Sequence, residues 1–560
     1  MRTMKMNDWK KKAIVYEAYV QSFNDSDGDG IGDLPGLIEK LDYIKNLGAN
    51  VIWLTPIFKS PLVDNGYDIA DYEAINPIYG SMNDFKKLLQ QAHERDLKIV
   101  MDLVVNHTSD QHKWFKESKK NRNNKYSDYY IWRDPKEDGS APTNLGSAFG
   151  GSAWTYVPER NQYYLHLFAK QQPDLNWDNP QVRNDIYQMM KFWLDMGVDG
   201  FRMDSISFIS KPSKFEDAPL EDNKEYGAYY YGSANGPHIH EYLREMNQKV
   251  LSKYDVISIG ETPHTTAREA RLFVEPDRHE LDMVFQFEHM HVDYGEFGRY
   301  SDVTFKMSDL RNSMTSWQND LSWNSNYLGN HDQPRIVSRF GNDSKYRKES
   351  AKMLAMVSLL QKGTPFIFQG EEIGMTNLHI KNIDELKDLE AHNIYSFLKS
   401  KGISDKDALK MVNRKTRDNA RTPMQWNKEQ NAGFSSGNPW IEVNPNYLEI
   451  NVKKDLQDSN SIYRFYQKLL KLRNNNQVLL DGNYDLITPE DSAIFAYTRS
   501  SDKDKVAVIC SFVPYKVKYE LPEDFVNKNK VILSNYDDRE DMASNTIYLR
   551  PYEGVVIKRE

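Results

Sequence analysis

Residues 98–107 read KIVMDLVVNH, an apolar run rich in β-branched residues that ends in two polar side chains. Such a run predicts a buried β-strand. Seven similar runs occur along the chain, separated by segments of helical period, so that the predicted strands cover residues 13–20, 51–58, 98–105, 200–207, 256–262, 281–287, 326–332 and 364–371. Eight strands with helical crossovers predict an α/β fold, a closed (β/α)8 TIM barrel.

Segments with apolar residues recurring at three and four positions lie between the strands and predict amphipathic helices. They include residues 37–47, 83–95, 181–196 and 346–360. Two gaps are longer than ordinary loops, which suggests a functional insertion in each. We expect a barrel over residues 1–105 and 178–477, an inserted small domain over 106–177 after the third strand, and a capping subdomain over 374–460 after the eighth. Residues 478–560 lose the helical period and predict a C-terminal antiparallel β-sandwich domain.

Composition excludes several classes of protein. The 560 residues carry a net charge of −9 with mixed signs, and no basic stripe is available for nucleic acid. No run approaches the roughly 18 to 20 apolar residues of a membrane span, and the N-terminus does not read as a signal peptide. The single cysteine, Cys510, lies in an apolar run and excludes an internal disulfide. We expect a cytoplasmic monomer or weak homo-oligomer acting on a small neutral substrate, with neither nucleic acid nor membrane as partner.

Four predicted strands end in polar residues, and in a barrel these ends meet at one face. The residues are Asn106 with His107, Arg202 with Asp204, Glu261, and Asn330 with His331 and Asp332. An isolated Asp or Glu at such a point often only caps the next helix. Polar residues at four strand ends together indicate a shared site for carboxylate chemistry or a hard metal.

Carboxyl groups on neighbouring strands suit cleavage of a glycoside with retention of configuration, which needs them about 5 to 5.5 Å apart. Arg202 lies two residues before Asp204 on the same strand face, and its charge would keep Asp204 ionised as a nucleophile. Glu261 has no adjacent cation in sequence. A carboxylate nearby should therefore favour its protonated form, as an acid catalyst requires.

These motifs resemble a known family. DLVVNH (102–107), GFRMD (200–204), the strand end at Glu261 and NHD (330–332) resemble the four signature regions of the α-amylase superfamily, glycoside hydrolase family 13. QPDLNW (172–177) is similar to an additional region of its oligo-1,6-glucosidase and α-glucosidase subgroup. The resemblance covers essentially the whole chain and implies a retaining α-glucoside hydrolase.

The resemblance also implies residue roles. Asp204 would be the nucleophile, Glu261 the general acid/base, and Asp332 the third carboxylate that helps to distort the sugar. The substrate would be contacted by Asp64, Tyr67, His107, Phe149, Phe168, Gln172, Arg202, Ser205, His331 and Arg417. Asp64 and Arg417 would bind the non-reducing end through charge-assisted hydrogen bonds and impose exo action, or else form only a structural ion pair.

The stretch DSDGDGIGD (25–33) places carboxylates at alternate positions, with glycines for tight turning. It resembles the start of a calcium loop. Gly36 stands where an EF-hand would have its twelfth-position Glu, which argues against an EF-hand. The resemblance implies one structural Ca²⁺, or Mg²⁺, held by Asp25, Asp27, Asp29, the carbonyl of Ile31, and Asp33; a metal-free acidic turn is the alternative.

The substrate is the open question. Oligo-1,6-glucosidases carry Val after the nucleophile and α-1,4-preferring relatives Ala or Thr, whereas this chain has Ser205. The segments FQGEEIGMTN (368–377) and ARTPMQW (420–426) resemble oligo-1,6-glucosidases most, which favours α-1,6-linked isomalto-oligosaccharides. The alternatives are an α-1,4-preferring or sucrose-cleaving α-glucosidase, a trehalose-6-phosphate hydrolase, or a sucrose isomerase, although QPRIVSRFGND (333–343) has the hydrolase-like form. A non-catalytic amylase-like protein is disfavoured because all three carboxylates are present.

Overall fold

The computed structural model describes residues 8–220, 224–488, 490–526, 529–540 and 545–560. Eight parallel strands form one sheet in the order β11-β10-β9-β5-β2-β1-β13-β12, which follows the chain around a near-closed barrel. The strands are β1 (Val15–Ala18), β2 (Val51–Leu54), β5 (Lys98–Val104), β9 (Gly200–Asp204), β10 (Ile257–Glu261), β11 (Met283–Phe285), β12 (Ser325–Asn326) and β13 (Thr364–Phe368). The predicted TIM barrel is confirmed, and each predicted strand is present.

Several strands are shorter than predicted because the backbone turns soon after the sheet. The strand predicted over 200–207 ends at Asp204, since Ser205 has a left-handed φ of 46° and a 3-10 helix, η3 (Ile206–Phe208), follows. The strand predicted over 326–332 is reduced to β12, so His331 and Asp332 lie in the loop beyond it. The reactive residues are thus placed on or just after the carboxyl ends of the strands.

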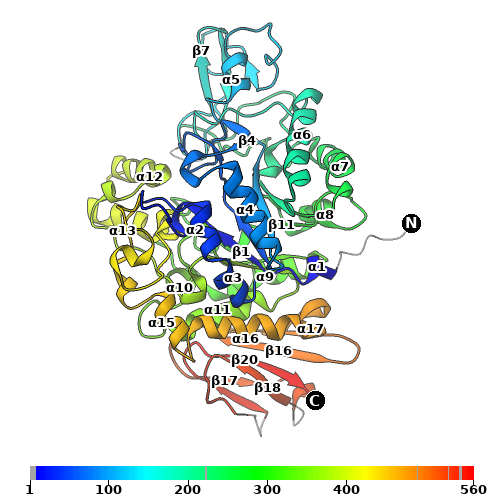
Figure 1. The fold of residues 1–560 in the computed structure, drawn as a ribbon, viewed down its shortest axis with the longest axis vertical. Coiled ribbons are helices and arrows are strands. Elements are labelled where there is room, and N and C mark those ends of the chain that lie inside the picture. The colour runs from blue at the N-terminus through cyan, green and yellow to red at the C-terminus, as the bar shows by residue number, and fades with distance from the viewer. Residues whose placement is uncertain (1–7, 221–223, 489, 527–528, 541–544) are drawn as a thin grey trace. The chain divides into compact units, whose positions relative to one another are not determined.

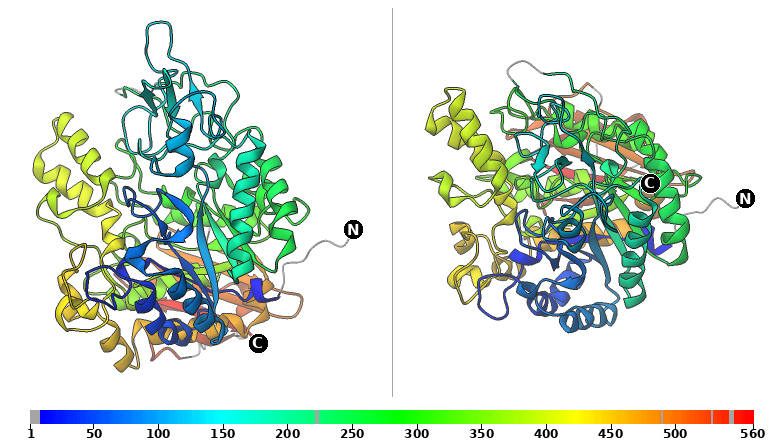
Figure 2. Two further views of the ribbon diagram at one scale, coloured as in Figure 1. Left: turned by 45° about the horizontal axis from the view of Figure 1, so that its top comes forward. Right: turned by 90° about the horizontal axis from the view of Figure 1, so that it is seen from above.

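The chain divides into two compact units, and the first contains residues 53–93 and 98–287. Its helices α6, α7 and α8 lie side by side (Figures 1 and 2). Asn179 caps the start of α6 and Pro180 occupies its first turn, while Gly197, with a φ of 111°, ends it. The helices of this unit are α4 (Met82–His93), α5 (Lys113–Ser118), α6 (Pro180–Met196), α7 (Ile239–Lys249) and α8 (Ala267–Val274).

The long segment after β5 has a sheet of its own. Three short antiparallel strands pair in the order β6-β8-β7. They are β6 (Trp132–Arg133), β7 (Trp154–Val157) and β8 (Gln162–Leu165), and a two-stranded sheet, β3 (Phe58–Lys59) with β4 (Asp71–Ile75), precedes β5. A separate apolar cluster that includes Trp154, Leu165 and Phe208 packs this segment.

The second unit contains residues 6–52, 94–97 and 288–560, of which 6, 7, 489, 527–528 and 541–544 lie outside the described residues. After β13 it carries the helices α12 and α13, which pack together around Ala391, Leu398 and Val412. Its helices are α1 (Asp8–Lys11), α2 (Leu34–Glu39), α3 (Leu41–Leu47), α9 (Met307–Asp320), α10 (Ile336–Phe340), α11 (Arg347–Leu359), α12 (Leu389–Ser400), α13 (Asp405–Lys415), α14 (Asp418–Arg421), α15 (Val452–Gln457), α16 (Ile462–Asn474) and α17 (Gln477–Asp481).

The C-terminal part of this unit is antiparallel, as predicted. A five-stranded sheet has the order β14-β15-β16-β20-β18, and a second sheet pairs β17 with β19. The strands are β14 (Asn483–Leu486), β15 (Ile494–Ser500), β16 (Lys505–Ser511), β17 (Val517–Glu520), β18 (Asn529–Ser534), β19 (Thr546–Leu549) and β20 (Gly554–Arg559). Cys510 is fully buried on β16, where it acts as a small core residue. Among the described helices, none has the length and apolarity needed to cross a membrane.

Candidate active site

Two buried carboxylates end neighbouring strands of the barrel. Asp204 is the last residue of β9 and Glu261 the last of β10, and the two strands pair in parallel. Their exposed fractions are 7% and 9%. Both side chains therefore sit at the carboxyl end of the sheet, the place that a barrel enzyme uses for chemistry.

One arginine joins these carboxylates. Arg202 Nη1 lies 2.9 Å from Asp204 Oδ1, and Nη2 lies 2.8 Å from Glu261 Oε1. Because both oxygens contact a single guanidinium, the two carboxyl groups lie close enough to act on one sugar ring. Glu261 has no adjacent cation in sequence, and the fold supplies one: the pairing of β9 with β10 positions Arg202 beside both carboxylates.

Arg202 also contacts a carboxylate outside the predicted site, that of Asp102 on β5. Arg202 Nη1 lies 2.9 Å from Asp102 Oδ1, and Asp102 Oδ2 accepts hydrogen bonds from Trp53 Nε1 at 3.1 Å and the Tyr67 hydroxyl at 3.0 Å. Burial alone would lower the pKa of Arg202, but the surrounding acids, Asp102 foremost, hold it well above its ordinary value. Arg202 is thus permanently charged, and Asp102, which had no predicted role, fixes its position.

Ser205 departs from ordinary backbone geometry immediately after Asp204. Its φ of 46° is left-handed, a conformation that few residues other than glycine adopt. In this conformation its backbone N–H donates to Glu261 Oε2 at 2.8 Å. The strained residue therefore links the end of β9 to the carboxylate of β10.

Another polar cluster gathers around His107 in the same unit. Gln172 Nε2 lies 3.2 Å from both Asp64 Oδ2 and His107 Nε2, and His107 Nε2 lies 3.0 Å from the carbonyl oxygen of Tyr67. Burial lowers the pKa of His107 and keeps it neutral. The structure thus brings together four of the predicted substrate-binding residues.

Aromatic rings adjoin this cluster. The Phe168 ring lies 5.2 Å from the His107 ring and 6.0 Å from the Phe149 ring, measured between centroids. A wall of aromatic faces beside hydrogen-bonding groups suits a sugar, which has apolar ring faces and polar edges. Phe168 thus adjoins His107 and Phe149 adjoins Phe168, and their role as the substrate wall stays a prediction.

Lys211 contacts buried oxygens beside the cluster around His107. Sequence reasoning did not identify this lysine. Its ammonium lies 2.8 Å from Asp174 Oδ1 and 2.7 Å from Asn106 Oδ1, with 4% of the residue exposed. Asn106 in turn lies 3.2 Å from His107 Nδ1. A buried lysine needs such paired oxygens, and an isolated Lys in a loop gives no periodic signal in a sequence.

Asp332, His331 and Arg417 belong to the second unit. Asp332 Oδ1 accepts from Arg421 Nη2 at 2.7 Å and lies 3.6 Å from Arg417 Nη1. Burial would raise the pKa of Asp332, but His331 and the two arginines hold it well below its ordinary value. Asp332 is therefore ionised, and its side chain is one-third exposed (33%).

Arg417 has another partner that was not predicted. Its Nε and Nη2 atoms donate to Asp388 Oδ1 at 2.9 and 2.7 Å. Asp388 caps α12, so the arginine is held by the segment after β13. Asp64 belongs to the other unit, and its pairing with Arg417 stays a prediction.

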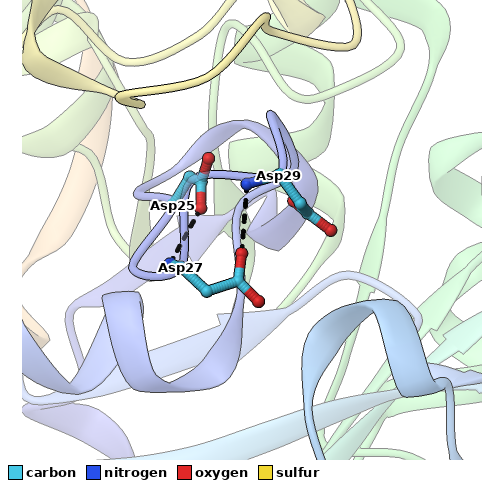
Figure 3. A group of neighbouring side chains, drawn as sticks. All are labelled: Asp25, Asp27 and Asp29. Carbon is cyan, nitrogen blue, oxygen red and sulfur yellow. Dashed lines mark hydrogen bonds between the residues drawn. The ribbon is translucent and has the colours of Figure 1, made fainter.

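The acidic loop after β1 gathers three carboxylates (Figure 3). Oxygens of Asp25, Asp27 and Asp29 lie within 4.8 Å of one another. Burial first, and then Asp27 and Asp25, raise the pKa of Asp29, as expected of acids that repel one another. A divalent cation would relieve this repulsion, so these oxygens fit the predicted hard metal.

The loop is also shaped by two glycines. Gly28 and Gly30 have positive φ, and a Cβ on Gly30 would lie 1.8 Å from the carbonyl oxygen of Asn438. Ile31 donates its N–H to Asp29 at 2.8 Å. Asp33 caps α2, accepting from Gly36 N, and lies outside the cluster of three, so its role as a ligand stays a prediction.

Comparison with known proteins agrees with this geometry. Residues 17–482 match the model of the α-amylase catalytic domain, and residues 494–556 match the α-amylase SusG C-terminal domain. The chain belongs to the α-amylase family.

The chain is similar to proteins of three kinds over nearly its whole length. It is 51% identical to an oligo-1,6-glucosidase of Parageobacillus thermoglucosidasius, over 98% of this chain and 99% of the relative. The crystal structure of trehalose-6-phosphate hydrolase from Bacillus licheniformis is 45% identical, with a TM-score of 0.93 over 99% of this chain and 100% of that one. An isomaltulose synthase mutant of Erwinia rhapontici NX5, in complex with its natural substrate sucrose, is 41% identical, with a TM-score of 0.95 over 99% of each chain.

Proposed function

We propose that this α-amylase family member is a retaining, exo-acting α-glucosidase that releases glucose from the non-reducing end of short α-1,6-linked glucosides. The observation that carries the proposal is Arg202, which contacts both Asp204 and Glu261. Relatives named oligo-1,6-glucosidase at about half identity over the whole chain support the substrate class. The wording of the motifs at 368–377 and 420–426 favours the same linkage.

In the first step Asp204 attacks the anomeric carbon and the glycosidic C–O bond breaks. Glu261 gives its proton to the leaving oxygen, and a covalent glucosyl-enzyme results. Water then attacks the same carbon, Glu261 takes its proton, and glucose leaves with Asp204 regenerated. Arg202 remains charged throughout and keeps the Asp204 carboxylate ionised between turnovers.

Three acids share the single positive charge of Arg202. This shortage of positive charge favours the protonated form of Glu261, which an acid catalyst requires. If Asp102, Asp204 and Glu261 were all ionised, their charges would exceed that of Arg202 by two. A proton on Glu261 relieves this excess while the bonds to Asp102 hold Arg202 in place. The shared cation thus supports a state in which one of the two catalytic carboxyl groups is protonated, and we assign that proton to Glu261.

The remaining predicted residues bind the sugar. We assign His107, His331 and Gln172 to the glucosyl hydroxyls, Asp332 to the charge that develops on the ring, and Phe149 and Phe168 to the apolar wall. Asp64, Tyr67 and Arg417 would close the end of the glucosyl subsite and impose exo action. Ser205 follows the nucleophile and would face the leaving group.

A structural Ca²⁺, or Mg²⁺, is part of the proposal. Asp25, Asp27, Asp29, the Ile31 carbonyl and Asp33 would hold it, and it would supply rigidity to the loop after β1. The three clustered carboxylates support this assignment. Cytoplasmic localisation is also proposed, because the single cysteine is buried on β16 and no disulfide stabilises the chain.

A substrate series tests the proposal. Initial rates of glucose release would be measured for isomaltose, panose, maltose, sucrose, isomaltulose and trehalose-6-phosphate, with an Asp204→Ala variant as control. Isomaltose or panose should give the highest kcat/KM, and the variant should lose activity at least about 10³-fold. A clear preference for maltose or trehalose-6-phosphate would overturn the linkage, and wild-type turnover by the variant would overturn the mechanism.

A further inference from the structure

A buried glutamate of the first barrel strand contacts His331. Glu17 lies on β1 with 1% of its surface exposed. Its Oε1 lies 2.6 Å from His331 Nδ1 and accepts the backbone N–H of His331 at 3.3 Å. The first distance is short, as expected for a hydrogen bond between charged partners.

On its other side His331 faces a second carboxylate. Its Nε2 lies 3.4 Å from Asp332 Oδ2. A neutral imidazole carries one N–H, whereas an imidazolium donates from both nitrogens. Two acids on opposite nitrogens therefore match the charged form.

We propose that Glu17 is a positioning residue that holds His331 as an imidazolium, so that Nε2 always carries a proton for Asp332 and the substrate. The role in catalysis rests on the proposed function, because it assumes that His331 and Asp332 contact the sugar. Glu17 would act only through His331, since its carboxylate is buried against that ring. The charge state of His331 is a property of the protein alone.

The surroundings of the pair support this assignment. Burial would lower the pKa of His331, but Asp332 and Glu17 raise it to about 10. The other charged groups near His331 are Arg421, whose Nε donates to the His331 carbonyl, and Arg417 beside Asp332, while the Tyr19 ring stacks at 6.2 Å. The two arginines repel a positive charge on the imidazole ring. Glu17 and Asp332 are therefore needed to stabilise the imidazolium.

Besides His331, the side chains of Arg335 and Glu371 lie close enough to Glu17 to interact with its charge, and Glu372 is next to Glu371. Arg335 is buried nearby and donates to the carbonyls of Gln369, Asn419 and Ala420. Burial and then Glu372 raise the pKa of Glu371 well above its ordinary value, and burial also raises the pKa of Glu372. Burial thus disfavours the ionised form of both neighbours, whereas the contact with His331 favours the ionised form of Glu17.

The glutamate at 371 offers a matched control. Glu371 is also buried, with 7% of its surface exposed against 1% for Glu17, and burial raises its pKa well above the ordinary value. In the described structure no hydrogen bond joins it to His331. Glu371→Gln therefore removes a nearby buried acid that does not contact His331, with little change of shape. Glu17→Gln removes a charge while keeping an oxygen that can accept from Nδ1.

The experiment is a ¹⁵N NMR titration of the protein with ring-labelled histidine, in which His331→Gln assigns the signals. The wild-type His331 midpoint should lie well above 8, Glu17→Gln should lower it by at least about one pH unit, a tenfold change in the proton affinity, and Glu371→Gln should leave it unchanged. A wild-type midpoint near the ordinary value of about 6.5, or equal midpoints in wild type and Glu17→Gln, would overturn the proposal. If Glu17→Gln does not fold, the wild-type titration alone still tests whether His331 is an imidazolium.

Kinetics then test the catalytic part separately. The alkaline limb of kcat/KM against pH should move toward neutral pH in Glu17→Gln and stay in place in Glu371→Gln. A purely steric role for Glu17 predicts an unshifted profile, because glutamine accepts the same hydrogen bond. If NMR shows the imidazolium but the enzyme cleaves no α-glucoside, the charge assignment stands and the proposed function fails.

Discussion

The backbone N–H of Ser205 donates to Glu261 Oε2 at 2.8 Å, so the residue after the proposed nucleophile is bonded to the proposed acid/base. This bond exists because Ser205 has a left-handed φ of 46°. The position that we expect to influence the linkage preference therefore also orients Glu261. Substitutions there should change both the linkage preference and the strain of the backbone.

Replacing Ser205 by Val should raise the ratio of isomaltose to maltose hydrolysis, because the added methyl groups would face the leaving group. A β-branched side chain is unfavourable at a positive φ, so the variant should also lose about 1 kcal/mol of stability. The kcat/KM ratio and the thermal midpoint would be measured together. Ser205→Gly, which relieves the strain and keeps the N–H, should keep or raise the midpoint, and an unchanged ratio in Ser205→Val would remove this residue as a determinant.

Replacing Asp102 by Asn should lower kcat by roughly 10- to 100-fold, because it removes a buried charge that orients Arg202. With one acid fewer around Arg202, the proton on Glu261 is held less firmly. The alkaline limb of the kcat profile should therefore move to lower pH. Trp53→Phe removes a donor to Asp102 and part of the ring that lies over Arg202, but it keeps the charge of Asp102. It is therefore the control for charge and should leave the limb in place; an equal shift of the limb in both variants would contradict a role for the charge.

The barrel could be predicted from sequence because most strands are apolar runs: seven of the eight predicted runs contain an observed barrel strand, and the eighth, 326–332, overlaps β12 only at Asn326. The ends of the strands could not be predicted, because the turn at Ser205 depends on a left-handed φ that no sequence pattern indicates. Glu17 and Asp102 were visible as single acids inside the apolar runs AIVYEAYV and KIVMDLVV. An acid buried in a barrel strand must be paired, which is a usable signal, but its partner is distant in the sequence: Arg202 on β9 for Asp102, and His331 in the loop after β12 for Glu17.

Lys211 gives a stability prediction. Lys211→Met should lower the free energy of unfolding by about 3–5 kcal/mol, because it leaves Asp174 buried without its cation. Urea unfolding measures the difference. Lys120→Met breaks an ion pair with Glu117 at the surface, where the lysine side chain is 59% exposed, and should cost less than about 1 kcal/mol. Similar costs for both variants would contradict the anchoring role.

The charge on His331 predicts a pH dependence of stability. Its pKa in the folded chain is raised to about 10, above its ordinary value of about 6.5, so folding is favoured by the full pairing free energy below pH 6.5. This contribution is lost as the pH rises through 10. The thermal midpoint of the wild type should therefore fall more steeply between pH 7 and 10 than that of His331→Gln, measured by calorimetry in matched buffers. Parallel curves for the two proteins would contradict the raised pKa.

The acidic loop predicts stabilisation by a cation. Ca²⁺ at about 100 times its dissociation constant should add about 2.7 kcal/mol to the free energy of unfolding, because only the folded loop gathers Asp25, Asp27 and Asp29. Thermal midpoints would be compared in EDTA, Ca²⁺ and Mg²⁺. Ca²⁺ should exceed Mg²⁺, since an irregular set of carboxylate and carbonyl oxygens suits the larger ion.

Asp27→Asn is the variant that separates this loop from other acidic groups of the surface. Asp27 is exposed and its Oδ1 accepts from Asp29 N, a bond that asparagine can keep, so the exchange should leave the EDTA midpoint nearly unchanged. It should also abolish most of the gain from Ca²⁺, because it removes one of three clustered charges. Equal midpoints of the wild type in EDTA and Ca²⁺ would refute the metal site. An unchanged Ca²⁺ response in Asp27→Asn would place the ion elsewhere, and an isomaltose kcat that is equal in EDTA and Ca²⁺ at low temperature would make its role structural.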